Sequence, residues 1–202
     1  MIRAFLFDLG NVLFPFDFTS VIHFLTKNGA RLKNLQTLKK LLREYETGRI
    51  STPEFYGKMK DLTGYTGTFE NFRKNFSDIF VENPDTLNLI PRIRQKYPVY
   101  LLSNTNEMHF HHLMETSPLL RELDGYLLSY EAGIMKPDPL IFQKAIERFD
   151  LEPGSTLFID DLADNIHSAA KCGFLTFHYI FKDGKPKKPL QDALTSYNVS
   201  LL

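Results

Sequence analysis

The chain has 202 residues, with 24 basic and 24 acidic side chains, so its formal net charge is zero. This length fits one domain, or one domain with a modest insertion. A balanced charge gives no reason to expect binding to nucleic acid or to an anionic membrane. The sequence has no apolar stretch of 18 residues and a single cysteine, Cys172. We therefore expect no transmembrane helix and no internal disulfide, which suits the reducing cytoplasm.

Short apolar runs alternate with amphipathic stretches along most of the chain. Runs of strand length lie at 4–7, 99–102, 125–129, 156–159 and 175–179. Stretches with helical periodicity lie between them, at 85–96, 107–116, 139–149 and 163–172. Asp85 is placed to cap the first of these helices, and Gly173 follows the last. The alternation predicts an α/β fold with a Rossmann-like parallel sheet and helices on both faces.

Residues 16–80 interrupt this alternation. They contain helical stretches, punctuated by glycines, at 18–27, 35–45, 53–62 and 69–80. We therefore predict a Rossmann-like core formed by 1–15 and 81–202, and a small helical cap formed by 16–80. Because the cap is inserted after the first strand, it is expected beside the carboxyl ends of the strands, where open parallel sheets bind ligands.

Acidic side chains follow two of the predicted strands. Asp8 comes directly after the first strand, and Asp160 and Asp161 come directly after the fourth. At an effective dielectric constant near 20, like charges about 4 Å apart repel by about 4 kcal/mol. A divalent cation removes that repulsion, and Mg²⁺ prefers one or two carboxylates together with waters and phosphate oxygens. The pattern predicts a metal-assisted site at one edge of the sheet.

Two more polar side chains stand near the ends of the other strands. Ser103 follows the second strand, and Lys136 lies beyond the third. Taken singly, Ser103 is typical of a helix N-cap and Lys136 of an exposed lysine. Their occurrence in order at successive strand ends, together with the acidic positions, favours a functional site.

The order and spacing of these motifs resemble the haloacid dehalogenase-like hydrolase superfamily, over nearly the whole chain. The resemblance is to the branch with a helical cap after the first motif. The segments Asp-Leu-Gly-Asn-Val, Ser-Asn-Thr-Asn and Asp-Asp-x-Ala-Asp-Asn are similar to those of small sugar-phosphate phosphatases, glucose-1-phosphate phosphatases among them. The resemblance implies a Mg²⁺-dependent phosphatase that acts on a small phosphorylated metabolite, in particular a sugar phosphate.

The resemblance also implies a role for each motif. Asp8 is the expected nucleophile, which attacks phosphorus and forms an aspartyl-phosphate. Lys136 and Mg²⁺ are expected to offset the repulsion between this carboxylate and the phosphate. Ser103 and the backbone amides of Asn104 and Thr105 are expected to bind the phosphate as neutral donors at a helix N-terminus.

A metal site follows from the same resemblance. The implied metal ligands are Asp8, the backbone carbonyl of Gly10, and Asp161. Asp161 stands 12 residues before Gly173, the spacing that the family's metal-binding aspartate keeps. Asp160 is then expected to act beside the metal or through a water, and Asn165 to orient Asp161 from one helical turn away.

One position departs from the family pattern. The first motif usually reads Asp-x-Asp, and its second aspartate acts as general acid and base, but here that position is Gly10. Such a group is typically worth about 10²–10⁴-fold in rate. The replacements that the sequence offers are Asn11, Asp17 and a cap histidine, and it does not choose among them.

The histidines offer a further metal hypothesis. His109, His111 and His112 cluster in one helical stretch, where His109 and His112 are neighbours on one face. Since nothing nearby completes a tetrahedral ligand set, we expect a surface or supporting role for this cluster. His23 is expected to pack inside the cap.

Two other functions stay open. A haloacid dehalogenase also uses a carboxylate nucleophile and lacks the second aspartate of the first motif. Those enzymes need no metal and lack the acid pair, so Asp160 and Asp161 argue against this alternative. The glycine at position 10 also suits a scaffold that binds phosphate and metal without turnover. The sequence names neither the substrate nor the oligomeric state.

Overall fold

The computed structural model describes residues 1–32, 34–182, 184–199 and 201. Its main sheet has five parallel strands in the order β3-β2-β1-β4-β5. The strands are β1 (Ala4–Phe7), β2 (Val99–Ser103), β3 (Gly125–Leu128), β4 (Thr156–Asp160) and β5 (Leu175–His178). Each predicted strand is confirmed to within one residue at either end. The predicted α/β fold with a Rossmann-like parallel sheet is therefore confirmed.

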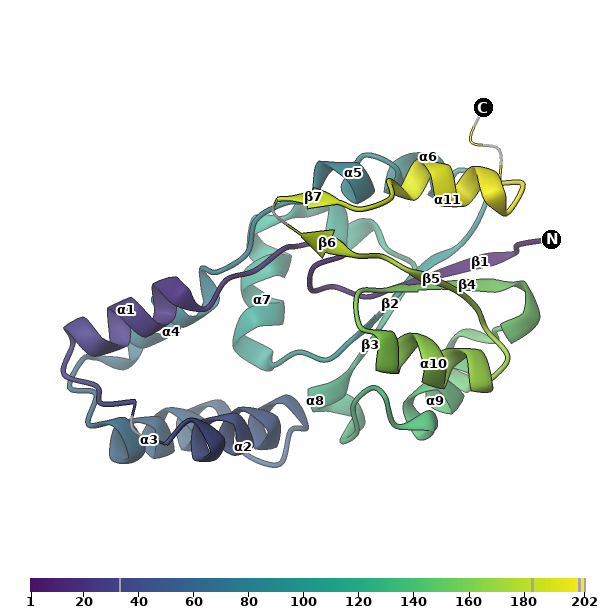
Figure 1. Cartoon of the computed structure of the whole chain (residues 1–202). Helices are drawn as coiled ribbons and strands as arrows, with labels where there is room; N and C mark the ends of the chain where they lie inside the picture. Colours follow the sequence, from purple (N-terminus) through teal and green to yellow (C-terminus); the bar gives the residue numbers. More distant parts are fainter. Residues whose placement is uncertain (33, 183, 200, 202) are drawn as a thin grey trace.

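Helices cover both faces of the sheet (Figure 1). One layer holds α6 (Ile90–Arg94), α7 (Glu107–Thr116) and α11 (Leu190–Ser196), and the other holds α9 (Pro139–Phe149) and α10 (Ala163–Lys171). The side chains of β1 alternate between the layers: Phe5 and Phe7 join the first cluster, whereas Ala4 and Leu6 join the second. Because both faces are buried, β1 is apolar at every position.

Short elements complete the core. They are α5 (Pro84–Leu87), α8 (Ser129–Ala132), the 3₁₀ turns Pro118–Glu122 and Pro153–Ser155, and the two-residue strands β6 (Phe181–Lys182) and β7 (Lys185–Pro186). None of the helices in the described part of the chain combines the length and apolar character needed to cross a membrane.

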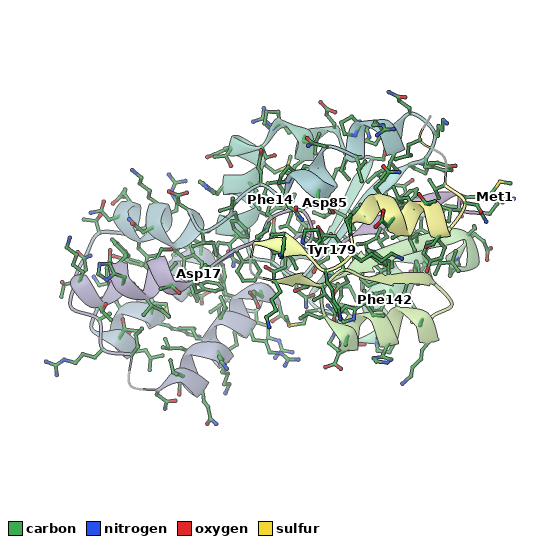
Figure 2. All side chains as sticks on the ribbon, turned by 45° about the horizontal axis from the view of Figure 1, so that its top comes forward. Met1, Phe14, Asp17, Asp85, Phe142 and Tyr179 are labelled. Carbon is green, nitrogen blue, oxygen red and sulfur yellow. The ribbon has the colours of Figure 1, made fainter. Side chains whose placement is uncertain are left out.

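The helix predicted over 85–96 is wrong in two respects. It is split into α5 and α6, because Pro91 at the start of α6 has no amide to donate to the preceding turn. Asn83, and not Asp85, caps α5. Asp85 instead accepts hydrogen bonds from the Tyr179 hydroxyl and the Leu190 amide, both at 3.0 Å, and Figure 2 shows Asp85 and Tyr179 close together. This carboxylate therefore ties α5 to the C-terminal segment.

Four helices between the first two strands form a separate bundle, on the left of Figure 1. They are α1 (Thr19–Lys27), α2 (Leu35–Glu46), α3 (Thr52–Thr63) and α4 (Phe69–Ser77), close to the predicted ranges except that α4 ends earlier. Their interior is a cluster of its own, rich in aromatic rings such as Tyr45, Phe55, Phe72 and Phe76. Tyr45 and Phe55 stack with ring centroids 4.4 Å apart.

Two connections and several direct contacts join this bundle to the core, among them a hydrogen bond from the Met108 amide on α7 to the Tyr45 hydroxyl. The connections run side by side, since the Val81 amide donates to the Pro15 carbonyl at 2.9 Å and Phe16 pairs with Phe80. At the end of α2, Gly48 adopts φ +65°, and a Cβ there would overlap the carbonyl oxygen of Tyr130. Glycine is required at this close approach of the bundle to α8.

Candidate active site

The two acidic motifs meet at the centre of the sheet. Strands β1 and β4 are neighbours, and Phe7 lies opposite Ile159. Asp8 follows the first of these residues and Asp160 the second, so both side chains reach the same edge. The strand order reverses direction at β1, and in open parallel sheets such a switch point leaves a crevice for ligands.

Lys136 reaches this edge from the loop after α8 and is fully enclosed. Its Nζ lies 2.8 Å from Asp8 Oδ1 and 2.6 Å from Asp160 Oδ2, and it donates to the Leu102 carbonyl at 2.9 Å. Burial lowers the pKa of the ammonium, but the charges of Asp160 and Asp8 outweigh that and hold its pKa above the ordinary value. Lys136 is therefore a buried cation whose three N–H donors all have partners. It is not the exposed lysine that its position alone would suggest.

The cluster has more negative than positive charge. Carboxylate oxygens of Asp8, Asp160 and Asp161 all lie within 4.8 Å of one another, against the one ammonium of Lys136. Burial raises the pKa of Asp8 to about 8, Lys136 opposes this rise, and the charges of Asp160 and Asp161 add to it. An all-oxygen donor set with two uncompensated charges fits a hard divalent cation such as Mg²⁺.

The carboxylate of Asp160 is held on all sides. Besides the bond to Lys136, it accepts from the Leu162 amide at 2.8 Å and from Asn165 Nδ2 at 2.9 and 3.0 Å. The prediction that Asn165 orients Asp161 is therefore wrong, because the helical turn of α10 aims its amide at Asp160. With its oxygens occupied in this way, Asp160 acts mainly to fix Lys136.

Asp161 is held less tightly. It is half-buried, and its Oδ2 accepts from Asn11 Nδ2 at 2.9 Å. Burial is the main reason why its pKa is raised, the bond from Asn11 lowers it, and the charge of Asp160 adds to the rise. Asn11, which the sequence offered as a replacement acid, is thus a positioning residue for Asp161. Asp17, the second suggestion, is exposed and bonds to Thr19.

Ser103 ends β2, the strand next to β1, and is 1% exposed. Its Oγ is the one buried side-chain polar atom in the described part of the chain that lacks a hydrogen-bond partner. An unpaired buried hydroxyl costs about 1–3 kcal/mol. An unpaired hydroxyl on the strand next to β1 indicates a polar ligand that accepts a hydrogen bond from Ser103.

Asn104 and Thr105, whose backbone amides were predicted to bind phosphate, make other contacts in the structure. The Asn104 side chain bonds to both the amide and the carbonyl of Lys136, each at 2.8 Å, so it fixes the lysine backbone. The Thr105 amide already donates to Ser129 Oγ at 3.0 Å, so it is not free for phosphate, contrary to the prediction. Helix α7 begins at Glu107, after Asn106 as its N-cap, so Ser103 lies before that N-terminus.

A cavity of about 60 Å³ lies between the helical bundle and these strand ends. It is lined by Leu9, Gly10, Phe16, Phe18, Glu46, Ile79, Phe80, Ser103, Asn104, Thr105 and His109. A larger hollow of about 520 Å³ lies outside, between α4 and α7, and contains none of the clustered acids. The acids do not line the smaller cavity either, but Leu9 and Gly10, which follow Asp8, and Ser103, which ends β2, do line it. The smaller cavity, next to the acidic cluster in the chain, therefore marks the candidate active site.

The histidine predictions are corrected in part. His109 is buried, with Nδ1 3.0 Å from Asn106 Nδ2 and Nε2 2.9 Å from the Phe76 carbonyl. Burial lowers its pKa to about 4, so it is neutral and both ring nitrogens are occupied. It is thus neither a surface group nor a metal ligand. His111 is exposed and His112 half-buried, as expected, whereas His23 is exposed instead of packed.

Sequence reasoning missed one acidic residue of this site altogether. Glu46 ends α2 and lines the cavity, although nothing in its local pattern distinguishes it from Glu44 or Glu54. The close approach at Gly48 and a hydrogen bond from Ser129 Oγ to the Glu46 carbonyl hold this end of the helix against the core. A glycine two residues after a helical glutamate was the sole signal present in the sequence.

Three comparisons bear on this geometry. Residues 2–173 match the haloacid dehalogenase-like hydrolase family. A D-ribitol-5-phosphate phosphatase from Bacteroides thetaiotaomicron is 33% identical over 188 residues, which cover 88% of this chain and 91% of that protein. An (S)-2-haloacid dehalogenase from Burkholderia cepacia is also 33% identical, but only over 51% of this chain and 45% of its own length.

A solved structure resembles the whole fold. It is a haloacid dehalogenase family enzyme from Bacteroides thetaiotaomicron, in complex with magnesium and inorganic phosphate. Its TM-score is 0.81 at 28% identity, and the match covers 94% of this chain and 99% of that one. The similarity therefore extends over the helical bundle as well as the sheet.

Proposed function

Because the chain belongs to the haloacid dehalogenase-like hydrolase family, we propose that it is a Mg²⁺-dependent phosphatase of a small sugar or polyol phosphate. The observation that carries the proposal is the buried cluster of Asp8, Asp160 and Asp161 around Lys136. Its excess of negative charge suits a divalent cation and a phosphate bound together. The extensive match to a ribitol-5-phosphate phosphatase supports the substrate class.

Asp8 is the proposed nucleophile. Its contacts with the Lys136 ammonium at 2.8 Å and with the Leu9 amide at 2.7 Å both fall on Oδ1. Oδ2 is left to attack phosphorus in line with the leaving oxygen, which forms an aspartyl-phosphate that water then hydrolyses. The proposed metal ligands are Asp8, Asp161 and the backbone carbonyl of Gly10. Bound Mg²⁺ would supply the positive charge that draws the phosphate oxygens toward the carboxylate.

Lys136 and Ser103 are the proposed phosphate-binding side chains. The ammonium of Lys136 stays charged and lies beside the nucleophile, so it offsets repulsion between two anions. The unpaired hydroxyl of Ser103 donates to a phosphate oxygen. The backbone amide of Asn104, a residue that lines the same cavity, is proposed as a second neutral donor. Asp160 keeps Lys136 in place, and Asn165 keeps Asp160 in place.

The bundle formed by residues 16–80 is the proposed cap. Small-molecule sites usually measure about 300–1,000 Å³, and the cavity under this cap is only about 60 Å³. A sugar phosphate therefore enters when the cap moves away from the strand ends, on the two paired connections near Pro15 and Val81.

The test is phosphate release from a panel of sugar and polyol phosphates, ribitol 5-phosphate included, with Mg²⁺ and with EDTA. We expect turnover that needs the metal. Metal-independent release of halide from haloacids would instead support the dehalogenase function. Folded protein that binds Mg²⁺ and phosphate but turns over nothing would support a binding scaffold and contradict the proposal.

A further inference from the structure

Among the described residues, Glu46 is the one acidic residue that lines the cavity of about 60 Å³. It belongs to the cap, while Gly10, Ser103 and Asn104 line the same space from the core. Gly10 follows Asp8 by two residues, and Ser103 ends the strand beside β1. Glu46 therefore borders the same small space as Ser103, the proposed phosphate donor, and as Gly10, two residues after the proposed nucleophile.

The side chain of Phe16 crowds position 10. A Cβ on Gly10 would come within 2.7 Å of Phe16 Cε1. Phe16 in turn packs against Phe18 and Phe80, with ring centroids 5.7 and 5.9 Å away. A side chain at position 10 would therefore require Phe16, which is 38% exposed, to shift. Because position 10 is glycine, an acid for the reaction must come from another residue.

The end of α2 that carries Glu46 is fixed to the core. The backbone carbonyl of Glu46 accepts from Ser129 Oγ at 2.6 Å, and the same hydroxyl lies 3.0 Å from both the amide nitrogen and the carbonyl oxygen of Thr105. One serine thus ties Glu46 to the segment that follows Ser103. The close approach of Gly48 to Tyr130 holds the next turn against α8. Glu46 is positioned by the same contacts that close the cap.

We propose that Glu46 is the general acid and base that replaces the aspartate missing at Gly10. This inference rests on the proposed phosphatase function. In the first step the Asp8 Oδ2–P bond forms and the P–O bond to the leaving group breaks; the leaving oxygen keeps the bonding pair and takes the proton of Glu46. In the second step water attacks phosphorus and gives its proton back to Glu46, and Asp8 departs as a carboxylate.

The electrostatic surroundings suit this exchange. Burial raises the pKa of Glu46 to about 7, against the opposing charge of Arg43 on the same helix. Of the other titratable groups nearby, His109 is neutral, and burial raises the pKa of Tyr45 and of Tyr130. Glu131 on α8 is a further acid near this end of α2. A carboxyl that titrates near neutral pH can both give and take a proton during turnover.

Leaving groups of different basicity test the proposal. Phenyl phosphate and p-nitrophenyl phosphate share a ring, but only the phenolate of the first needs a proton as it departs. We expect Glu46→Gln to lower kcat/KM for phenyl phosphate by about 10²–10³-fold and to change it less than about tenfold for p-nitrophenyl phosphate. Glu44→Gln is the matched control, because Glu44 lies on the same helix and faces Lys58 at 3.7 Å.

The outcomes separate this inference from the function on which it rests. If the native protein with Mg²⁺ releases phosphate from neither ester and from none of the sugar and polyol phosphates, the phosphatase function itself fails. If the native protein is active and Glu46→Gln lowers both substrates equally, or neither, Glu46 is not the acid. Urea unfolding of each variant excludes loss of the fold as the cause, and Glu46→Asp should recover part of the activity on phenyl phosphate.

Discussion

At the strand ends of the core, three buried charged side chains and the half-buried Asp161 lie together, whereas the interior of the cap is built from aromatic rings. Asp8, Lys136, Asp160 and Asp161 each depend on specific partners 2.6–2.9 Å away. Phe55, in contrast, packs against rings at centroid distances of 4.4–6.1 Å. Hydrogen bonds and ion pairs therefore fix the orientation of the charged side chains in the core. The cap is stabilised by apolar burial, which tolerates small shifts of the rings.

The difference separates two tasks. Buried charges that are mutually paired keep one arrangement, because removing any partner leaves a charge uncompensated. In the proposed function, the aromatic bundle needs only to stay folded while it moves over the strand ends. Glu46 is the exception, since it is an acid that the cap presents to the core. The following variants test each side of this comparison.

The largest effect is expected at the nucleophile. Asp8→Asn removes the attacking carboxylate and nearly keeps its shape, so turnover with Mg²⁺ should fall by about 10⁴-fold or more. Phosphate release over hours measures such a loss. Asp17→Asn, which removes an exposed carboxylate in the connection to the cap, should stay within about twofold. Activity of Asp8→Asn within tenfold of the native protein would contradict the role of Asp8.

Removing the buried cation should cost stability. Lys136→Met leaves Asp8 and Asp160 facing each other in the interior, which should lower the free energy of unfolding by about 3–5 kcal/mol. Urea unfolding at pH 7.5 measures this loss. Lys144→Met, an exposed position on α9, should change stability by less than about 0.5 kcal/mol. A loss below about 1 kcal/mol at Lys136 would mean that the charges are not truly buried.

Removing an aromatic ring from the interior of the cap should lower the free energy of unfolding by a similar amount, but the effect should be confined to the cap. Phe55 is 1% exposed, and Phe55→Ala should lower stability by about 3–5 kcal/mol. Hydrogen exchange should quicken in α2, α3 and α4, while β1 and β4 stay protected. Leu35 is 61% exposed, so Leu35→Ala is the control. Equal acceleration in sheet and cap would show that the two parts unfold as one unit.

The smallest effect is a change in the pH dependence of stability. The folded pKa of Glu46 is about 7 and its ordinary value is 4.5, so below pH 4.5 both states are protonated. Between these values the unfolded state loses its proton first, and stability falls as pH rises; above pH 7 the full penalty applies. For a partly exposed side chain this amounts to about 2 kcal/mol.

Glu46→Gln removes that penalty. From pH 4.5 to pH 8 its stability should rise by about 2 kcal/mol relative to the native protein. Unfolding in urea at these two pH values measures the change. A constant difference between Glu46→Gln and the native protein at both pH values would show that the carboxyl is not desolvated.

The core could be predicted from local rules. Each strand is a short apolar run, and the residue after it must lie at the carboxyl edge, so Asp8, Ser103 and Asp160 were placed by the sheet alone. Their partners were harder to predict. Asn165 bonds to Asp160 instead of Asp161 because a helical side chain points back toward the N-terminus of its helix, and that direction decides which carboxylate it reaches.

The positions of cap residues relative to the site could not be predicted. Helix periodicity indicates which face of a helix is buried, but not which segment packs against that face. His23 falls on a face that proved exposed. Glu46 is held at the cavity by contacts with α8, namely the approach of Gly48 to Tyr130 and the hydrogen bond from Ser129. Asn83 took the capping position expected for Asp85, which a contact with Tyr179 draws elsewhere. Such outcomes depend on tertiary contacts between segments far apart in the sequence.

The most direct test of the account is whether Asp8 becomes phosphorylated. Native protein and Glu46→Gln would be mixed with Mg²⁺ and p-nitrophenyl phosphate, quenched in acid, digested and examined by mass spectrometry. We predict one added phosphoryl group on the peptide that contains Asp8, more of it in Glu46→Gln because hydrolysis of the intermediate is slowed, and none in Asp8→Asn. Steady turnover without a phosphorylated peptide in either protein would contradict the account.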